Sequence, residues 1–352
     1  MPSIQEAKAR LDSIIAKART DMYKPIQIAE VLYQSRIQNV DISDMENFRN
    51  SSKQWRNTVT KRLLGKFSTS SADYQDAIWS AMPIDSLMVL DLENKRTCGG
   101  VERYIYLRFR ERQEKVGEII SLLDEAKPEN FRVEQILNQF RTEIAIKRTI
   151  DKAYEIVSYS LFQTIVAALE AKIKIVIPES ELLTEFSDLA KLLLGFESDT
   201  REIPAHIYRV GVTNAADRGL DMWANFGIAI QVKHLTLDPS IAQSIVDQVE
   251  SDRILIVCRD CDAEVITTVV RQISWGRRIC GIIRESELII WYDRCLRGRF
   301  AYQLSQNLIA TLSDGFKTEF PQAQEINTFL NERNYLSTTP DRQWMTSIDQ
   351  PT

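Results

Sequence analysis

The order of apolar patterns after Pro178 constrains the fold of this 352-residue chain more than any other feature. A helical pattern covers 180–195, with Ser180 as its N-cap and Gly195 at its end. Strand-like runs follow it, at 203–213, 219–226, 227–235 and 253–258. Helical stretches flank the last of these runs, at 239–250 and 262–275, and a second hairpin is expected at 278–293. This order predicts an α/β domain in which helices flank a mixed central sheet.

The chain before Pro178 reads mostly as helices. Residues 4–18 have helical apolar spacing, a second helix is expected to begin near Pro25, and helical spacing extends over most of 102–168. Within that stretch, the nine residues VERYIYLRF (101–109) alternate aromatic and charged side chains, which predicts a strand. We therefore expect a mostly α-helical region at 1–178, the α/β domain at 179–335 and a flexible tail at 336–352.

Composition narrows the classes of protein further. The longest stretch without a charged residue, 156–169, has 14 residues, fewer than the roughly 17 that a membrane-spanning helix needs. The N-terminus has no apolar signal region, and five cysteines, an odd number, suggest reduced thiols. We expect a cytoplasmic protein with no membrane partner. Its net charge of −5 does not reveal where the charges lie.

The motif that carries chemistry lies on the first predicted hairpin. Asp221 is on one strand, and Gln231-Val232-Lys233 is on the other, ten residues later. Gln231 and Lys233 project from the same face, and the turn brings Asp221 beside them. A carboxylate can hold Mg²⁺ against a phosphate, and a lysine can position the attacking water and stabilise negative charge. The group predicts phosphodiester hydrolysis.

These residues resemble the signature of the PD-(D/E)xK nucleases, in the branch that has Gln in place of the middle acid, as in Mrr-like nucleases. The core of that family is a helix, a three-strand meander, a crossover helix and a further strand, and residues 180–258 match this order. The resemblance implies a restriction-endonuclease-like core with Asp221, Gln231 and Lys233 as catalytic residues.

The wider sequence resembles the HaeII type of type II restriction endonuclease. Four segments carry this resemblance: KPIQIAEVLYQSR (24–36), SKQWR (52–56), TSSADYQD (69–76) and YRVGVTNAADRGLDMWANFG…QVKHL (208–235). It implies a homodimer that uses Mg²⁺, and no nucleotide cofactor, to cut double-stranded DNA at a palindrome of the form purine-GCGC-pyrimidine. Two symmetric strands require two symmetric active sites.

With Gln231 in the motif, a single carboxylate remains, which is few ligands for Mg²⁺. The related branch supplies a Glu from the helix before the first strand, which implies Glu185, with Glu181 as the alternative. The Val232 carbonyl is a further expected metal ligand. Asp217 either supports the metal site from behind its ligands or caps the turn before the strand.

The residues from 47 to 72 include six basic side chains and no acid. The basic residues are Arg49, Lys53, Arg56, Lys61, Arg62 and Lys66. Unopposed Lys and Arg side chains bind DNA by releasing counterions, which predicts contacts with the phosphate backbone. The alternative interpretation is the solvated surface of ordinary helices.

Two other functions are compatible with the motif. The first is a Mrr-like nuclease that acts on modified DNA. The second is a DNA-binding protein that keeps the nuclease fold without activity. The hairpin motif itself also has a purely structural interpretation, as a solvent-facing turn with scattered charges.

Overall fold

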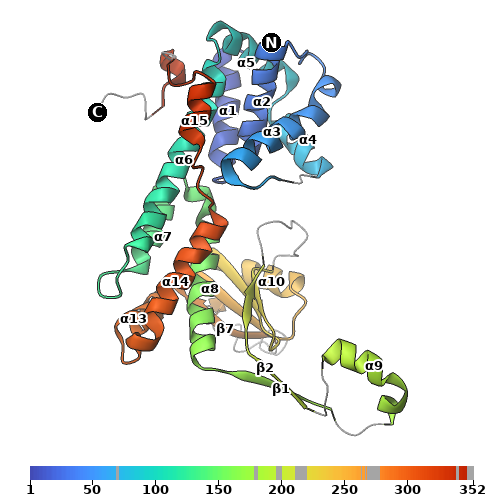
Figure 1. Ribbon diagram of the computed structural model, residues 1–352, viewed down its shortest axis with the longest axis vertical. Coiled ribbons are helices and arrows are strands. Elements are labelled where there is room, and N and C mark those ends of the chain that lie inside the picture. The colour runs from blue at the N-terminus through green and yellow to red at the C-terminus, as the bar shows by residue number, and fades with distance from the viewer. Residues whose placement is uncertain are drawn as a thin grey trace. The chain divides into compact units, whose positions relative to one another are not determined.

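The computed structural model describes residues 1–68, 71–177, 181–195, 200–210, 220–262, 264–265, 267, 278–337 and 341–346. The chain forms two compact units, which Figure 1 shows with their helices and strands. Unit 1 comprises Met1–Glu125, Gln135–Ala153 and Phe316–Thr352, and unit 2 comprises Ala126–Glu134 and Tyr154–Gly315. This division differs from the boundary expected at residue 178. No helix within the described residues is both long enough and apolar enough to cross a membrane.

Unit 1 is helical, as the sequence predicted. Its elements are α1 (Ile4–Lys17), α2 (Tyr23–Gln38), η1 (Met45–Asn47), α3 (Arg49–Leu64), α4 (Ala72–Ala81), α5 (Ile84–Arg96), α6 (Gly100–Asp124), α7 (Val133–Thr142), η2 (Lys147–Thr149), α15 (Ile326–Glu332) and η3 (Arg342–Trp344). A capping box fixes the start of α1, because the Ser3 hydroxyl accepts the Glu6 amide hydrogen while the Glu6 carboxylate accepts that of Ser3.

The strand expected at 101–109 is wrong, because these residues form the first turns of α6. Nearly all of them are buried, including Glu102 and Arg103. A helix that packs on every side has no polar face, so its sequence loses the one-sided pattern that identifies amphipathic helices. The charged residues in this stretch form buried polar contacts. They do not mark the solvent-exposed face of a strand.

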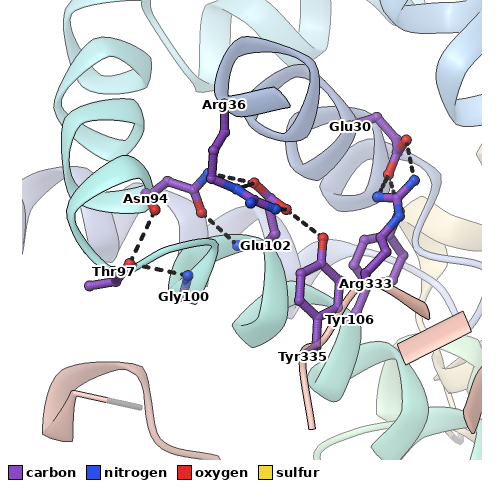
Figure 2. Close-up of polar contacts among 9 residues, drawn as sticks. All are labelled: Glu30, Arg36, Asn94, Thr97, Gly100, Glu102, Tyr106, Arg333 and Tyr335. Atoms are coloured by element: carbon purple, nitrogen blue, oxygen red, sulfur yellow. Dashed lines mark hydrogen bonds and ion pairs between the residues drawn. The ribbon is translucent and has the colours of Figure 1, made fainter. Parts of the chain in front are cut away.

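Glu102, which is completely buried, is the centre of a polar network that Figure 2 shows. Its carboxylate accepts hydrogen bonds from Arg36 Nε at 2.9 Å and Nη2 at 2.8 Å, and from the Tyr335 hydroxyl and the Asn94 amide at 2.5 Å each. The Asn94 side chain also accepts the Glu102 amide hydrogen at 3.2 Å. These donors compensate the cost of burying the charge.

A second buried acid joins the C-terminal segment to α2. Glu30 accepts two hydrogen bonds from Arg333, at 2.6 and 3.0 Å, and one from the Tyr106 hydroxyl at 2.5 Å (Figure 2). The Arg333 guanidinium lies over the Tyr33 ring, 3.7 Å from its centroid. The two networks explain why the C-terminal segment belongs to unit 1, together with the N-terminal helices.

The tail expected at 336–352 is partly packed. Trp344 in η3 is completely buried and donates a hydrogen bond to the Glu93 carboxylate at 3.0 Å. Residues 338–340 and 347–352 lie outside the described residues.

Unit 2 is the predicted α/β domain. Its helices are α8 (Ile150–Ala168), α9 (Leu182–Leu194), α10 (Pro239–Gln248), α13 (Glu285–Arg297) and α14 (Ala301–Glu319), of which α8 begins and α14 ends in unit 1. Its strands are β1 (Lys172–Val176), β2 (Thr200–Pro204), β3 (Ile207–Arg209), β4 (Met222–Ala224), β5 (Ala229–Leu237), β6 (Ile254–Cys261) and β7 (Ile279–Arg284).

Within the described residues, five strands form one sheet in the order β3-β4-β5-β6-β7. The first three strands are antiparallel, and β5, β6 and β7 are parallel to one another, with α10 as the crossover between β5 and β6. The register of the predicted hairpin is Met222 opposite Ile230 and Trp223 opposite Ala229. A mixed α/β core with the order expected of a restriction-endonuclease-like fold is thus confirmed.

Two details of the sheet differ from expectation. The run predicted as one strand at 203–213 is divided, since β2 pairs with β1 in a separate two-stranded sheet and β3 begins the main sheet. The second hairpin, expected at 278–293, is wrong: after β7 the chain enters α13, where the Glu287 carboxylate accepts the Arg284 amide hydrogen at 2.9 Å and fixes the helix start. Most of the helix predicted at 262–275 lies outside the described residues.

Candidate active site

The β4–β5 hairpin brings the motif residues together. One further step of its register places Asp221 opposite Gln231. The Asp221 carbonyl accepts a hydrogen bond from the Val210 amide at 2.9 Å, which ties the residue to the chain that continues β3. Asp221 is therefore held at the end of β4 by backbone contacts on one side and by the hairpin on the other.

The Asp221 carboxylate accepts the Val232 amide hydrogen at 2.8 Å. The Ile228 carbonyl, four residues earlier on the same strand, accepts a hydrogen bond from β4 at Ala224. Alternate residues of a strand direct both their N–H and C=O groups toward the same neighbour, so the Val232 carbonyl also faces the β4 side. A carboxylate oxygen and a carbonyl oxygen are thereby directed to the same end of the hairpin.

Gln231 and Lys233 project from one face of β5, because side chains alternate along a strand. Gln231 is 1% exposed, whereas Lys233 is half-buried, so the ammonium group retains access to solvent. Their neighbours on β6 are Ile256 and Cys258, both completely buried. An apolar floor therefore lies beside the polar residues.

A groove of about 520 Å³ lies at the turn of the β4–β5 hairpin, and its lining does not include Asp221, Gln231 or Lys233. It is lined by Leu220, Trp223, Ala229 and the segment 248–251 at the end of α10. Trp223 is two residues from Asp221, and Ala229 is two residues from Gln231, so all four side chains project from the same face of the hairpin. These two lining residues of the groove are therefore on the face that carries the motif. The small side chain of Ala229 contributes to this space, as the sequence suggested.

Two further acids were predicted for the site from the sequence. Asp217 lies outside the described residues. Glu185 is exposed on α9, a helix with no buried residue at all. Within the part of the chain that the structure describes, no hydrogen bond or ion pair links Glu185 to β4 or β5.

A buried acid, Glu155, lies on α8. Gln163 accepts the Ile207 amide hydrogen at 3.1 Å and contacts His206 Nδ1 at 3.2 Å, which sets α8 against the start of β3. One turn earlier, burial raises the pKa of Tyr159, and the charge of Arg209 opposes that shift. Helix α8 and strand β3 therefore run in opposite directions along each other.

Glu155 is one turn beyond Tyr159. Glu155 lies eight residues, about 12 Å of helix, before Gln163. Helix α8 packs on the face of the sheet that carries Ala224, Ile228 and Ile230, which is opposite to the face of Gln231. Glu155 is 4% exposed. A signal was present in the sequence, because this acid immediately precedes the longest uncharged stretch of the chain.

The chemistry of these donors suits a hard divalent cation. Mg²⁺ prefers a few oxygen ligands and retains several waters, which carboxylates and a backbone carbonyl can complete. Among the described residues, no three acidic, histidine or cysteine side chains gather in a group of metal ligands. Among the described residues, the oxygen donors at this end of the hairpin are the Asp221 carboxylate and the Val232 carbonyl.

The basic residues of 49–66 mostly bind acids or carbonyls of unit 1. Arg49 pairs with Asp76, Arg62 with Glu325 and Glu332, and Lys66 donates to the Glu319 carbonyl. Arg56 is completely buried and donates to Gln27, so it is not available to a phosphate. Lys53 is half-buried and Lys61 is exposed.

Comparison with known proteins identifies the relatives of this chain. The sequence profile of the HaeII restriction endonuclease family matches residues 7–335. The type II restriction enzyme HaeII of Haemophilus aegyptius is 45% identical over 344 residues, which are 95% of this chain and 98% of the relative. The type II restriction enzyme NgoBI of Neisseria gonorrhoeae is 43% identical over 333 residues, or 93% of this chain and 95% of the relative. No solved structure has significant similarity to the chain.

Proposed function

Since the chain belongs to the HaeII restriction endonuclease family, we propose that it is a type II restriction endonuclease that cleaves both strands of DNA with Mg²⁺. The observation that carries the proposed chemistry is the Asp221 carboxylate on the Val232 amide, in the hairpin that also holds Gln231 and Lys233. Incubation of the pure protein with unmodified plasmid DNA tests the proposal. Discrete fragments that require Mg²⁺ are expected, and intact DNA would contradict it.

Each motif residue has a distinct role in the proposed reaction. Asp221 and the Val232 carbonyl hold the metal ion. When bound, Mg²⁺ neutralises charge that develops at the phosphate and lowers the pKa of water. The Lys233 ammonium orients the attacking water and stabilises the negative charge of the transition state, while the Gln231 amide fixes the position of these groups.

We assign the further acid of the metal site to Glu155, because it is a buried carboxylate on α8, the helix that contacts the start of β3 through Gln163. Asp217 keeps its proposed role of supporting the site from the preceding segment. Glu185, proposed from sequence, is the rival ligand.

Glu155→Gln is expected to reduce the cleavage rate at least about 100-fold, because it would remove the charge of a proposed metal ligand. Glu185→Gln is the matched control and is expected to keep the rate within about threefold, since an exposed single charge contributes little. Initial rates on a plasmid substrate measure both variants, and thermal melts verify that they fold. A slow Glu185→Gln enzyme beside a fast Glu155→Gln enzyme would restore the original assignment.

The proposed DNA target is a palindrome of the form purine-GCGC-pyrimidine, which rests on the resemblance to the HaeII type. A two-fold homodimer would present two active sites to the two strands. Lys53 and Lys61 remain proposed contacts with the phosphate backbone, in the cytoplasm where unmodified foreign DNA is met. Cleavage that requires modified bases would favour the Mrr-like nuclease. Binding of DNA without cleavage would favour a DNA-binding protein that keeps the nuclease fold without activity.

A further inference from the structure

Helix α9 presents an apolar surface that no described residue buries. Its large apolar side chains are between 40% and 83% exposed: Leu182, Phe186, Leu189, Leu192, Leu193 and Leu194. The backbone of α9 is kinked at Phe186 (φ −107°, ψ 16°), and Leu189 and Leu193 lie on one stripe of the regular helix after the kink. An exposed apolar stripe of this length is typical of a surface that binds another protein.

The hairpin β1–β2 carries α9, and Figure 1 shows the helix at its far end. The base of the hairpin is fixed to unit 2, because the Ala205 amide bonds the Ala171 carbonyl at 2.8 Å and the Asn225 side chain bonds the Pro204 carbonyl at 2.9 Å. We call the described residues of 172–204 the arm. The arm offers an apolar helix on an extended support, with an anchored base.

Unit 2 also contains an apolar cavity of about 610 Å³. It lies between α8, the sheet and the α13–α14 corner, and its walls include Leu161, Ile165, Ile230, Ile283, Trp291 and Phe300. Phe300, at the corner, is 51% exposed. A space of this volume accommodates several leucine-sized side chains.

Charge distinguishes the two surfaces and makes them complementary. An acidic stripe of α9 consists of Glu181 and Glu185 before the kink at Phe186 and Asp188 after it, all of them exposed. Two arginines of the cavity, Arg294 and Arg299, are exposed, and neither forms an ion pair with a residue that the structure describes. Acids on the arm thus match bases at the cavity.

We propose that α9 of one copy of this chain inserts its leucine stripe into the α8–α13 cavity of a second copy, with the acidic stripe against Arg294 and Arg299. Each copy has one arm and one cavity, so two copies exchange arms and form a closed two-fold dimer. The inference rests on the proposed function only in that palindrome cleavage requires such a dimer. The contacts themselves are independent of the cleavage chemistry.

The test is the mass of the full chain in solution, measured by sedimentation at micromolar concentration. The wild-type protein is expected at about 81 kDa, twice the 40.5 kDa of one chain. The double variant Leu189→Asp/Leu193→Asp is expected to weaken dimerisation at least about 100-fold, since two charges would enter an apolar pocket. The control Leu92→Asp/Ile144→Asp alters two side chains of unit 1 that are 63% and 80% exposed and is expected to remain dimeric.

Charge reversal identifies the pairing. Glu181→Arg/Asp188→Arg and Arg294→Glu/Arg299→Glu are each expected to weaken the dimer at least about tenfold. A single chain that carries all four changes is expected to recover it. A monomeric wild type, a dimeric Leu189→Asp/Leu193→Asp variant, an equal loss in the control or no recovery in the fourfold variant would each overturn the proposal. Because mass and DNA cleavage are separate measurements, an inactive dimer would overturn the proposed function alone.

Discussion

Lys233→Ala is expected to lower the rate of DNA cleavage by a factor of about 10³ or more. The side chain lies on β5 beside Gln231, opposite buried Cys258, and it is half-buried at the motif end of the sheet. Removal of its ammonium group leaves no cation from the motif to position water or to stabilise the charge of the transition state. The fold is expected to persist, because the ammonium group is accessible to solvent.

Single-turnover cleavage of a plasmid measures the effect, and a filter-binding assay measures DNA affinity in parallel. Affinity is expected to change less than about tenfold, because a DNA interface contains many phosphate contacts. Lys127→Ala, an exposed lysine elsewhere in unit 2, is the matched control and is expected to cleave at the wild-type rate. A Lys233→Ala variant as fast as this control would remove Lys233 from the mechanism.

Glu102→Gln is expected to lower the free energy of unfolding by about 3–5 kcal/mol. The carboxylate is completely buried and accepts hydrogen bonds from Arg36, Asn94 and Tyr335. Glutamine has nearly the same shape but no charge, and its amide group presents donors to other donors. The Arg36 guanidinium is then left with only 19% of its side chain exposed and without its acid.

Urea titration monitored by tryptophan fluorescence measures this loss. Glu118→Gln is the control, because it breaks an exposed ion pair with Lys115 and is expected to cost at most about 1 kcal/mol. If the two variants differed by less than about 1 kcal/mol, the Glu102 network would not be a determinant of stability.

The β4–β5 hairpin was predictable because its signals are local. Gly227 has a positive φ of 85°, which suits a turn, and the alternation of Ile228, Ile230 and Val232 sets the faces of β5. Once the register is fixed, Asp221 and Gln231 must be neighbours. The spacing of the motif was therefore enough to predict which of its residues lie side by side.

Other parts of the fold were not predictable from local patterns. The residues of 101–109 are buried on all sides of α6, which removes the helical period, and Glu287 converts an expected turn into the start of α13. The path of the chain is also non-local, since Glu30 on α2 and Arg333 near the C-terminus are 303 residues apart. The ion pairs of the basic segment 49–66 depend on such contacts, so composition suggested more free charge than unit 1 presents.

The place of the helix that carries Glu185 shows the same limit. Glu185 was chosen because its helix immediately precedes the strands in sequence. The hairpin β1–β2 instead places that helix on the arm, and α8, which comes before the arm, packs beside β3. The helix that precedes the sheet in space is therefore not the one that precedes it in sequence.

The most direct test of the central claim uses two synthetic duplexes of equal length and composition. One contains AGCGCT, a purine-GCGC-pyrimidine palindrome, and the other contains AGGCCT, a palindrome of the same bases. With Mg²⁺, the protein is expected to cut both strands of the first duplex and neither strand of the second, and EDTA is expected to abolish the cleavage. Cleavage of both duplexes at equal rates, or of neither in the presence of Mg²⁺, would contradict the account.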